Sequence, residues 1–141
     1  MHTSQSYYSN YYGWSWFSDM RRAFLGYFDF VNPPGYMAVS TNLYYNSGLW
    51  DAFRIEIDAG RSVVFLVDSN GDSLTDHFVT VIGYDVVGDV KQYAALNTWD
   101  KSIHWYPFGP LSSGKPRGIY GATTFRIYYL ENAVFLPNVM K

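Results

Sequence analysis

The sequence DHFVTVIGYDVVGDVKQYAALNTWD, residues 76–100, decides the fold. It holds two runs of β-branched and aromatic residues, 77–84 and 91–98, which are typical of β-strands. Between them, residues 85–89 predict a five-residue loop, closed by Tyr84 opposite Val90 in an antiparallel hairpin. In that register His77 faces Asn97 on the same side of the sheet, at the separation of cross-strand neighbours.

The rest of the chain extends this hairpin into an α+β domain. Apolar residues at three- and four-residue steps predict helices over 15–31 and 48–59. Further β-branched and aromatic runs predict strands over 62–68, 103–108 and 123–130, so that the sheet spans 62–130. Loops are predicted at 33–46 and 109–122. Two helices followed by an antiparallel meander indicate a single α+β domain over 15–141, preceded by an irregular aromatic arm over 1–14.

A facing His and Asn have chemical meaning. A carboxamide oxygen that accepts a hydrogen bond from one imidazole nitrogen fixes the tautomer and leaves the other nitrogen as a base. We therefore expect Asn97 to orient His77. Trp99, two residues further on, points to the same face and is expected to shield that hydrogen bond from water.

These residues resemble the papain-like cysteine peptidases. Asp76-His77 followed by an apolar strand ending in Gly83-Tyr84, and then Asn97-Thr98-Trp99, follow the order and spacing of that family, and the region 50–84 is similar to its double-glycine-peptidase-like and streptopain-like bacterial groups. The resemblance implies a papain-like half-barrel, acyl transfer with His77 and Asn97 as catalytic residues, and a peptide or protein substrate. It also implies a bacterial or mobile-element source.

The sequence departs from the family at the nucleophile, because it contains no cysteine. The family places its Cys at a helix start, where the helix dipole lowers the thiol pKa. Either a Cys-bearing segment lies outside this sequence, which we favour, or Ser15 occupies the nucleophile position. In both cases the chain as written is expected to be an inactive, truncated enzyme or pseudoenzyme.

The connection before His77 suggests a cation site. Asp68, Asn70, Asp72 and Asp76 follow the order of the first oxygen ligands in EF-hand-type calcium loops, although the Glu expected at the twelfth position is absent. We expect weak calcium binding that stiffens the loop carrying His77. The alternative is an ordinary polar turn, which the same residue types also form.

Composition limits the remaining functions. The net charge is −2 and charged residues make up 16%, with no basic cluster, so nucleic acid is not an expected partner. No apolar run reaches the roughly 18 residues of a membrane span. The residue usage slightly favours a secreted protein, and an incomplete fold would expose an apolar face that a second copy covers. A calcium-stabilised peptide- or glycan-binding module and a structural or interaction domain stay open as alternatives.

His104 and Glu56 are not expected to take part in catalysis. His104 is expected to be a surface or sheet-edge residue, since no second metal ligand lies at a suitable spacing. Glu56 is expected on the solvated face of the second helix.

Overall fold

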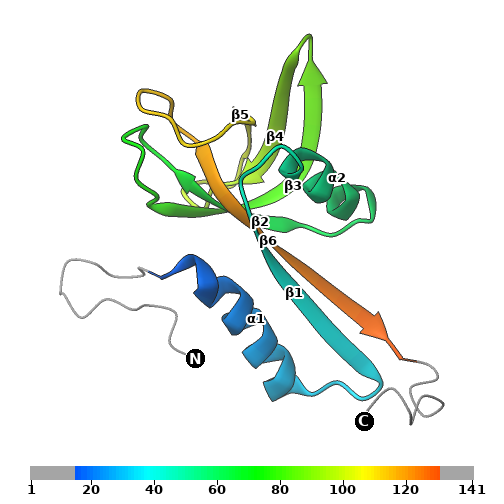
Figure 1. Cartoon of the computed structure of the whole chain (residues 1–141). Helices are drawn as coiled ribbons and strands as arrows, with labels where there is room; N and C mark the ends of the chain where they lie inside the picture. Colours follow the sequence, from blue (N-terminus) through cyan, green and yellow to red (C-terminus); the bar gives the residue numbers. More distant parts are fainter. Residues whose placement is uncertain (1–14, 131–141) are drawn as a thin grey trace. The chain divides into compact units, whose positions relative to one another are not determined.

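The computed structural model describes residues 15–130, so the predicted arm at 1–14 and the end of the predicted domain, 131–141, lie outside the described residues. Two helices and six strands occur in this part of the chain (Figure 1). Their order is α1 (Phe17–Val31), β1 (Tyr36–Tyr44), α2 (Leu49–Asp58), β2 (Val63–Asp68), β3 (His77–Val87), β4 (Val90–Leu96), β5 (Ile103–Pro107) and β6 (Gly118–Tyr129). The predicted α+β class is confirmed.

Both predicted helices are present, with ends within two residues of the expected ones. The predicted loop at 33–46 is wrong, because residues 36–44 form β1. This segment, YMAVSTNLY, has the aromatic and β-branched residues that favour strands, and its apolar residues do not alternate regularly. The Pro33-Pro34-Gly35 turn before it gave the stronger signal for a loop.

The sheet has the strand order β1-β6-β2-β3-β4-β5. Strands β2 to β5 form the predicted meander, whereas β6 returns to pair antiparallel with β2. Strand β6 begins at Gly118, inside the predicted loop at 109–122. Only glycine fits there, since a Cβ at this position would lie 2.6 Å from the carbonyl oxygen of Pro110.

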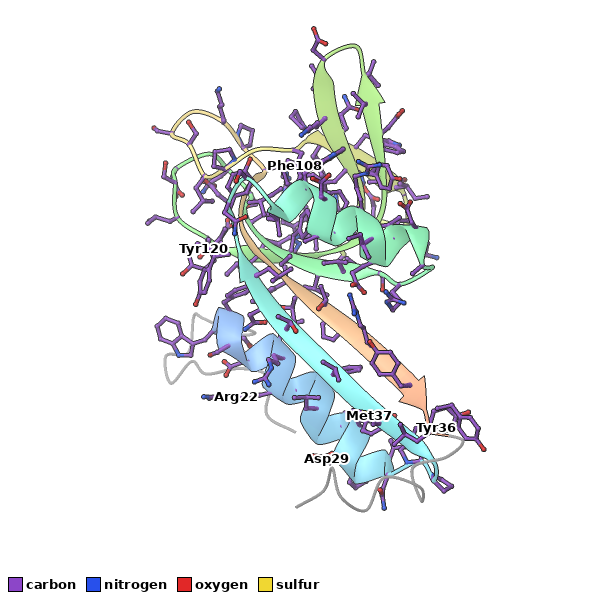
Figure 2. The ribbon with its side chains drawn as sticks, turned by 45° about the vertical axis from the view of Figure 1, so that its right-hand side comes forward. Arg22, Asp29, Tyr36, Met37, Phe108 and Tyr120 are labelled. Atoms are coloured by element: carbon purple, nitrogen blue, oxygen red, sulfur yellow. The ribbon has the colours of Figure 1, made fainter. Side chains whose placement is uncertain are left out.

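The chain forms two compact units, and β1 and β6 contribute residues to both. The described part of the first unit comprises residues 15–40 and 125–130. Within it, Phe24 of α1 meets Phe125 edge to face at 4.8 Å, and the Arg21 Nε donates to the carbonyl of Ser40 at 2.7 Å. Arg22 lies on the same helix with an exposed side chain (Figure 2).

The second unit, residues 41–124, contains the main hydrophobic core. Helix α2 lies against β2 and β3, and its Phe53 is fully buried (Figure 1). Phe53 stacks on Phe108 at 5.5 Å, and Figure 2 shows Phe108 beside this helix. The remaining fully buried apolar side chains come mainly from the strands that carry the candidate site: Val63, Phe65, Val67, Val79, Val81, Tyr93, Ala95, Ile119 and Ala122.

The predicted register of the central hairpin is wrong. Strand β3 continues to Val87 and strand β4 begins at Val90. Gly88 and Asp89 alone therefore form the turn, with Gly88 at φ 60°. Tyr84 therefore pairs with Tyr93 instead of Val90. A two-residue turn with a positive φ matches the twist of the flanking strands better than a longer loop does.

A β-bulge between Val81 and Gly83 shifts the register once more. Val81 and Tyr84 are three residues apart, so strict alternation would place them on opposite faces of the sheet. The extra residue lets both face the core, where Tyr84 meets the Trp50 ring at 5.8 Å. Beyond the bulge, Val81 pairs with Ala95 and Thr80 with Leu96.

Glu56 is 1% exposed, contrary to the expected solvated position. Its carboxylate accepts a hydrogen bond from Arg61 Nε at 2.6 Å, and this ion pair joins the helix to the segment entering β2. No helix within residues 15–130 is both long and apolar enough to cross a membrane.

Candidate functional site

His77 begins β3 and lies where the hairpin meets the segment after β4. In the observed register, the Trp99 ring lies opposite the imidazole, and the two rings stack at 4.4 Å with an angle of 11°. The structure thus brings His77 and Trp99 together directly. The stack covers part of the half-buried imidazole, whereas Trp99 is 57% exposed.

One nitrogen of the imidazole is held by the backbone of Asn97. His77 Nε2 lies 2.6 Å from the Asn97 carbonyl oxygen. Because a carbonyl oxygen can only accept, Nε2 is the protonated nitrogen and donates this hydrogen bond. Nδ1 makes no hydrogen bond with the residues that the structure describes, so in the neutral ring it carries a free lone pair.

The Asn97 carboxamide differs from its predicted role. It is buried, its Nδ2 donates to the Tyr106 hydroxyl at 3.3 Å, and its Oδ1 accepts from the Trp99 backbone at 3.1 Å. The side chain therefore fixes the turn that carries Trp99, and the backbone carbonyl of the same residue holds the imidazole. In the predicted register the Asn97 side chain would face His77. Because the observed register is shifted, the Asn97 backbone carbonyl meets the imidazole instead.

Thr98, between these two residues, has φ 69°. This left-handed conformation is unfavourable for a β-branched residue. It turns the Asn97 carbonyl toward the imidazole on one side and the Trp99 ring toward it on the other. Strained residues of this kind persist where the surroundings determine the backbone, and they cluster at functional sites.

Sequence reasoning missed Arg117, which lies just before β6. Its Cζ is 4.7 Å from the centre of the Trp99 ring and 5.0 Å from that of Tyr106. Its backbone is clamped at φ 71°, with its N–H donating to the Asp68 carbonyl and its carbonyl accepting from the Tyr93 hydroxyl. The only signal was a lone Arg in a Gly/Pro-rich loop, which says nothing about its partners.

His104 has a partner that its sequence context did not suggest. Its Nε2 donates to both carboxylate oxygens of Asp100, at 2.9 and 3.0 Å. Hydrogen bonds from His104 and then from the Ser102 backbone lower the pKa of Asp100. His104 is half-buried on β5, Asp100 is exposed in the loop before it, and the imidazole of His104 stacks on Tyr106 at 6.0 Å.

The predicted calcium residues lie in the loop between β2 and β3, where their side chains accept hydrogen bonds from the loop's own backbone N–H groups. Asp68 is fully buried, and its carboxylate accepts from the backbone N–H groups of Gly71, Ser73 and Asn70 at 2.6, 2.6 and 3.1 Å. Burial raises the pKa of Asp68, but the backbone donors together lower it more, and the net pKa lies below its usual value.

The other three side chains make similar turns. Asn70 Oδ1 accepts from the Asp72 backbone, Asp72 Oδ1 accepts from the Leu74 backbone, and Asp76 Oδ1 accepts from the Ser69 backbone. Within residues 15–130, no three His, Cys, Asp or Glu side chains gather as a metal-binding group. A cation at this loop would compete with the loop's own N–H groups for these oxygens.

Ser15, the candidate nucleophile position, belongs to the first unit, whereas His77 belongs to the second. It lies two residues before the start of α1. Its side chain is half-buried.

Comparisons with protein-family models, with curated proteins and with solved structures each gave no significant match. The geometry of the site is therefore the basis for a functional assignment.

Proposed function

We propose that this chain carries the base side of a papain-like acyl-transfer site and that it is inactive as written, because it supplies no thiol. One observation supports this most: the Asn97 carbonyl holds His77 Nε2 at 2.6 Å, which leaves Nδ1 as the free base. Trp99 stacks on the same ring and keeps water from one of its faces. The parent substrate is a peptide or protein.

In the proposed reaction, Nδ1 takes the proton of a thiol while the sulfur attacks a peptide carbonyl. The imidazolium so formed keeps its hydrogen bond from Nε2 to the Asn97 carbonyl, which stabilises the positive charge. Nδ1 then gives its proton to the departing amine, and an acyl-thioester remains. Water hydrolyses this thioester with His77 again acting as base.

The nucleophile is the component that the chain does not supply. A thiol from residues outside this sequence is our preferred source, and Ser15 is the alternative. A hydroxyl gains much less than a thiol from a histidine base, because its pKa lies far above that of the imidazole. A chain that uses Ser15 would therefore have poor activity or none.

The base can be tested with a small external thiol. We expect the chain to accelerate thiolysis of an activated ester by cysteamine above the rate in buffer. His77→Ala should return the rate to that of buffer. His104→Ala is the matched control, because it removes another half-buried, hydrogen-bonded histidine, and it should leave the rate unchanged. An unchanged rate in His77→Ala would contradict the proposed base.

The Ser15 alternative has its own test. In the variant Ser15→Cys, alkylation by iodoacetamide should be accelerated only if His77 can reach the new thiol. The double variant Ser15→Cys/His77→Ala is the control. Equal alkylation rates in the two variants would remove Ser15 as the nucleophile position and leave the external segment.

A non-catalytic binding module is the second candidate. It is favoured by the exposed ring of Trp99 and by Arg117, which contacts that ring. The Arg117 guanidinium has no anionic partner within the described residues. In this case neither the wild type nor His77→Ala would accelerate thiolysis. A chain that shows neither thiolysis nor ligand binding would be a structural or interaction domain.

A further inference from the structure

We infer that Arg117 forms a binding site for a carboxylate group, placed against Tyr106 and against Trp99, the ring that also stacks on the imidazole of His77. Carboxylate binding is a property of these side chains alone. Its role in selecting a substrate for His77 rests on the proposed function and deepens it.

The Arg117 guanidinium has no polar partner within residues 15–130. The ion pairs there involve Arg54, Arg61 and His104. None of the hydrogen bonds of the described residues uses a side-chain nitrogen of Arg117, and its Nη1 is buried without a partner. A guanidinium has five N–H donors, and leaving a buried donor unsatisfied is costly.

Arg54 also has one buried nitrogen without a hydrogen-bond partner, its Nε, but its Nη1 pairs with the carboxylate of Asp51 at 3.5 Å. Arg61 binds Glu56, and Arg21 donates to the Ser40 carbonyl. Arg22 has no such bond, but its side chain is exposed and water can satisfy it. Arg117 is half-buried between two rings, which make cation–π contacts with it and accept no hydrogen bond from its side chain.

The backbone holds the cation at this place at a conformational cost. Arg117 adopts φ 71°, which a side-chain-bearing residue rarely takes. Two hydrogen bonds, to the Asp68 carbonyl at 2.6 Å and from the Tyr93 hydroxyl at 3.0 Å, clamp its peptide groups. A strained, clamped cation is preorganised for an anion, because little freedom is left to lose on binding.

The planar fork of a guanidinium matches the two oxygens of a carboxylate. In a peptide, this group comes either from an acidic side chain or from the C-terminus. Both sources present the same chemistry to Arg117, and they can be separated by the choice of ligand.

The experiment uses two pairs of short peptides. One pair is acetylated trialanine with a free C-terminal carboxylate and its C-terminal amide. The other is an acetylated, amidated tripeptide with a central glutamate and the same peptide with glutamine. We expect the acid of at least one pair to bind and its neutral counterpart not to bind, as measured by NMR shifts of the Trp99 indole N–H. The pair that responds identifies the source of the carboxylate.

Variants locate the site. Arg117→Gln and Arg117→Gly should each weaken binding by about ten- to a hundred-fold, which is the usual value of hydrogen bonds to a charged group. Glycine adopts the positive φ without strain, so this variant keeps the fold if glutamine does not. Arg22→Gln is the matched control and should bind like the wild type.

His77→Ala separates this inference from the proposed function. We expect this variant to lose thiolysis and to keep carboxylate binding. The inference is overturned if the wild type binds acid and neutral peptides alike, if inorganic phosphate binds as well as the peptide acids, or if the glycine variant at position 117 binds like the wild type.

Discussion

At the residue scale, Thr98 carries a cost that its neighbours impose. A β-branched residue in the left-handed region loses about 1–2 kcal/mol, and glycine avoids this loss but costs about 0.5–1 kcal/mol in unfolded-state entropy. Thr98→Gly should therefore stabilise the fold by up to about 1 kcal/mol in urea unfolding. The control Thr80→Gly, in the extended backbone of β3, should destabilise it. Equal losses in both variants would argue against strain at Thr98.

Asp68, in contrast to Thr98, stabilises the folded state, because its carboxylate organises the loop before His77. Asp68→Asn replaces one acceptor oxygen by an amide and leaves a loop N–H unsatisfied, at a cost of about 1–3 kcal/mol at neutral pH. Asp72→Asn is the control, since its exposed side chain accepts from one backbone group only. Unfolding free energies of the three proteins at pH 7 measure the effect.

The same residue predicts a pH dependence. The folded pKa of Asp68 is lowered, so its contribution is fully present above the unfolded-state pKa of about 4 and is lost as the pH falls through the folded value. The stability difference between the wild type and Asp68→Asn should therefore shrink in acid. A difference that stays constant from neutral pH to below about pH 3 would contradict this assignment.

At the scale of elements, the β3–β4 hairpin decides which ring faces His77. In the observed register Asp85 pairs with Gln92. Because the chain has no cysteine, Asp85→Cys/Gln92→Cys should oxidise readily to an intramolecular disulfide, whereas Asp85→Cys/Asp89→Cys, the pair expected for a five-residue loop, should not. Mass spectrometry after mild oxidation reads the result. Preferential oxidation of the second pair would instead support the predicted five-residue loop, in which His77 faces Asn97.

The loop between β2 and β3 is the element on which the calcium proposal rests. Its side-chain oxygens already accept backbone hydrogen bonds, so a cation must share them, and we expect binding only in the millimolar range of weak extracellular calcium modules. Calcium should then raise the thermal midpoint of the wild type and not that of Asp72→Asn. Saturation at micromolar calcium, or no shift at millimolar calcium, would contradict weak binding.

At the scale of the whole molecule, local patterns predicted the elements better than their pairing. The helices were found because Phe17, Phe24, Leu49 and Phe53 repeat at helical steps. Strand β1 was missed beside its Pro-Pro-Gly turn, and the register was missed because a two-residue turn and a bulge leave no clear pattern in sequence.

The candidate site was predictable only in part. His77 and Trp99 were named from sequence, and they meet in the structure. Arg117 comes from a distant segment, and its contacts with Trp99 and Tyr106 depend on how β6 returns to the sheet. The Asn97 carbonyl, and not the Asn97 side chain, meets His77. This also depends on the positive φ of Thr98, which no sequence rule assigns to a threonine.

The most direct test of the account is the tautomer of His77 in solution. Long-range proton–nitrogen NMR spectra of the neutral imidazole distinguish the protonated nitrogen from the one with a lone pair. We predict a proton on Nε2, held by the Asn97 carbonyl, and a free lone pair on Nδ1. A proton on Nδ1, or rapid exchange between the two tautomers, would contradict the assignment of His77 as an oriented base.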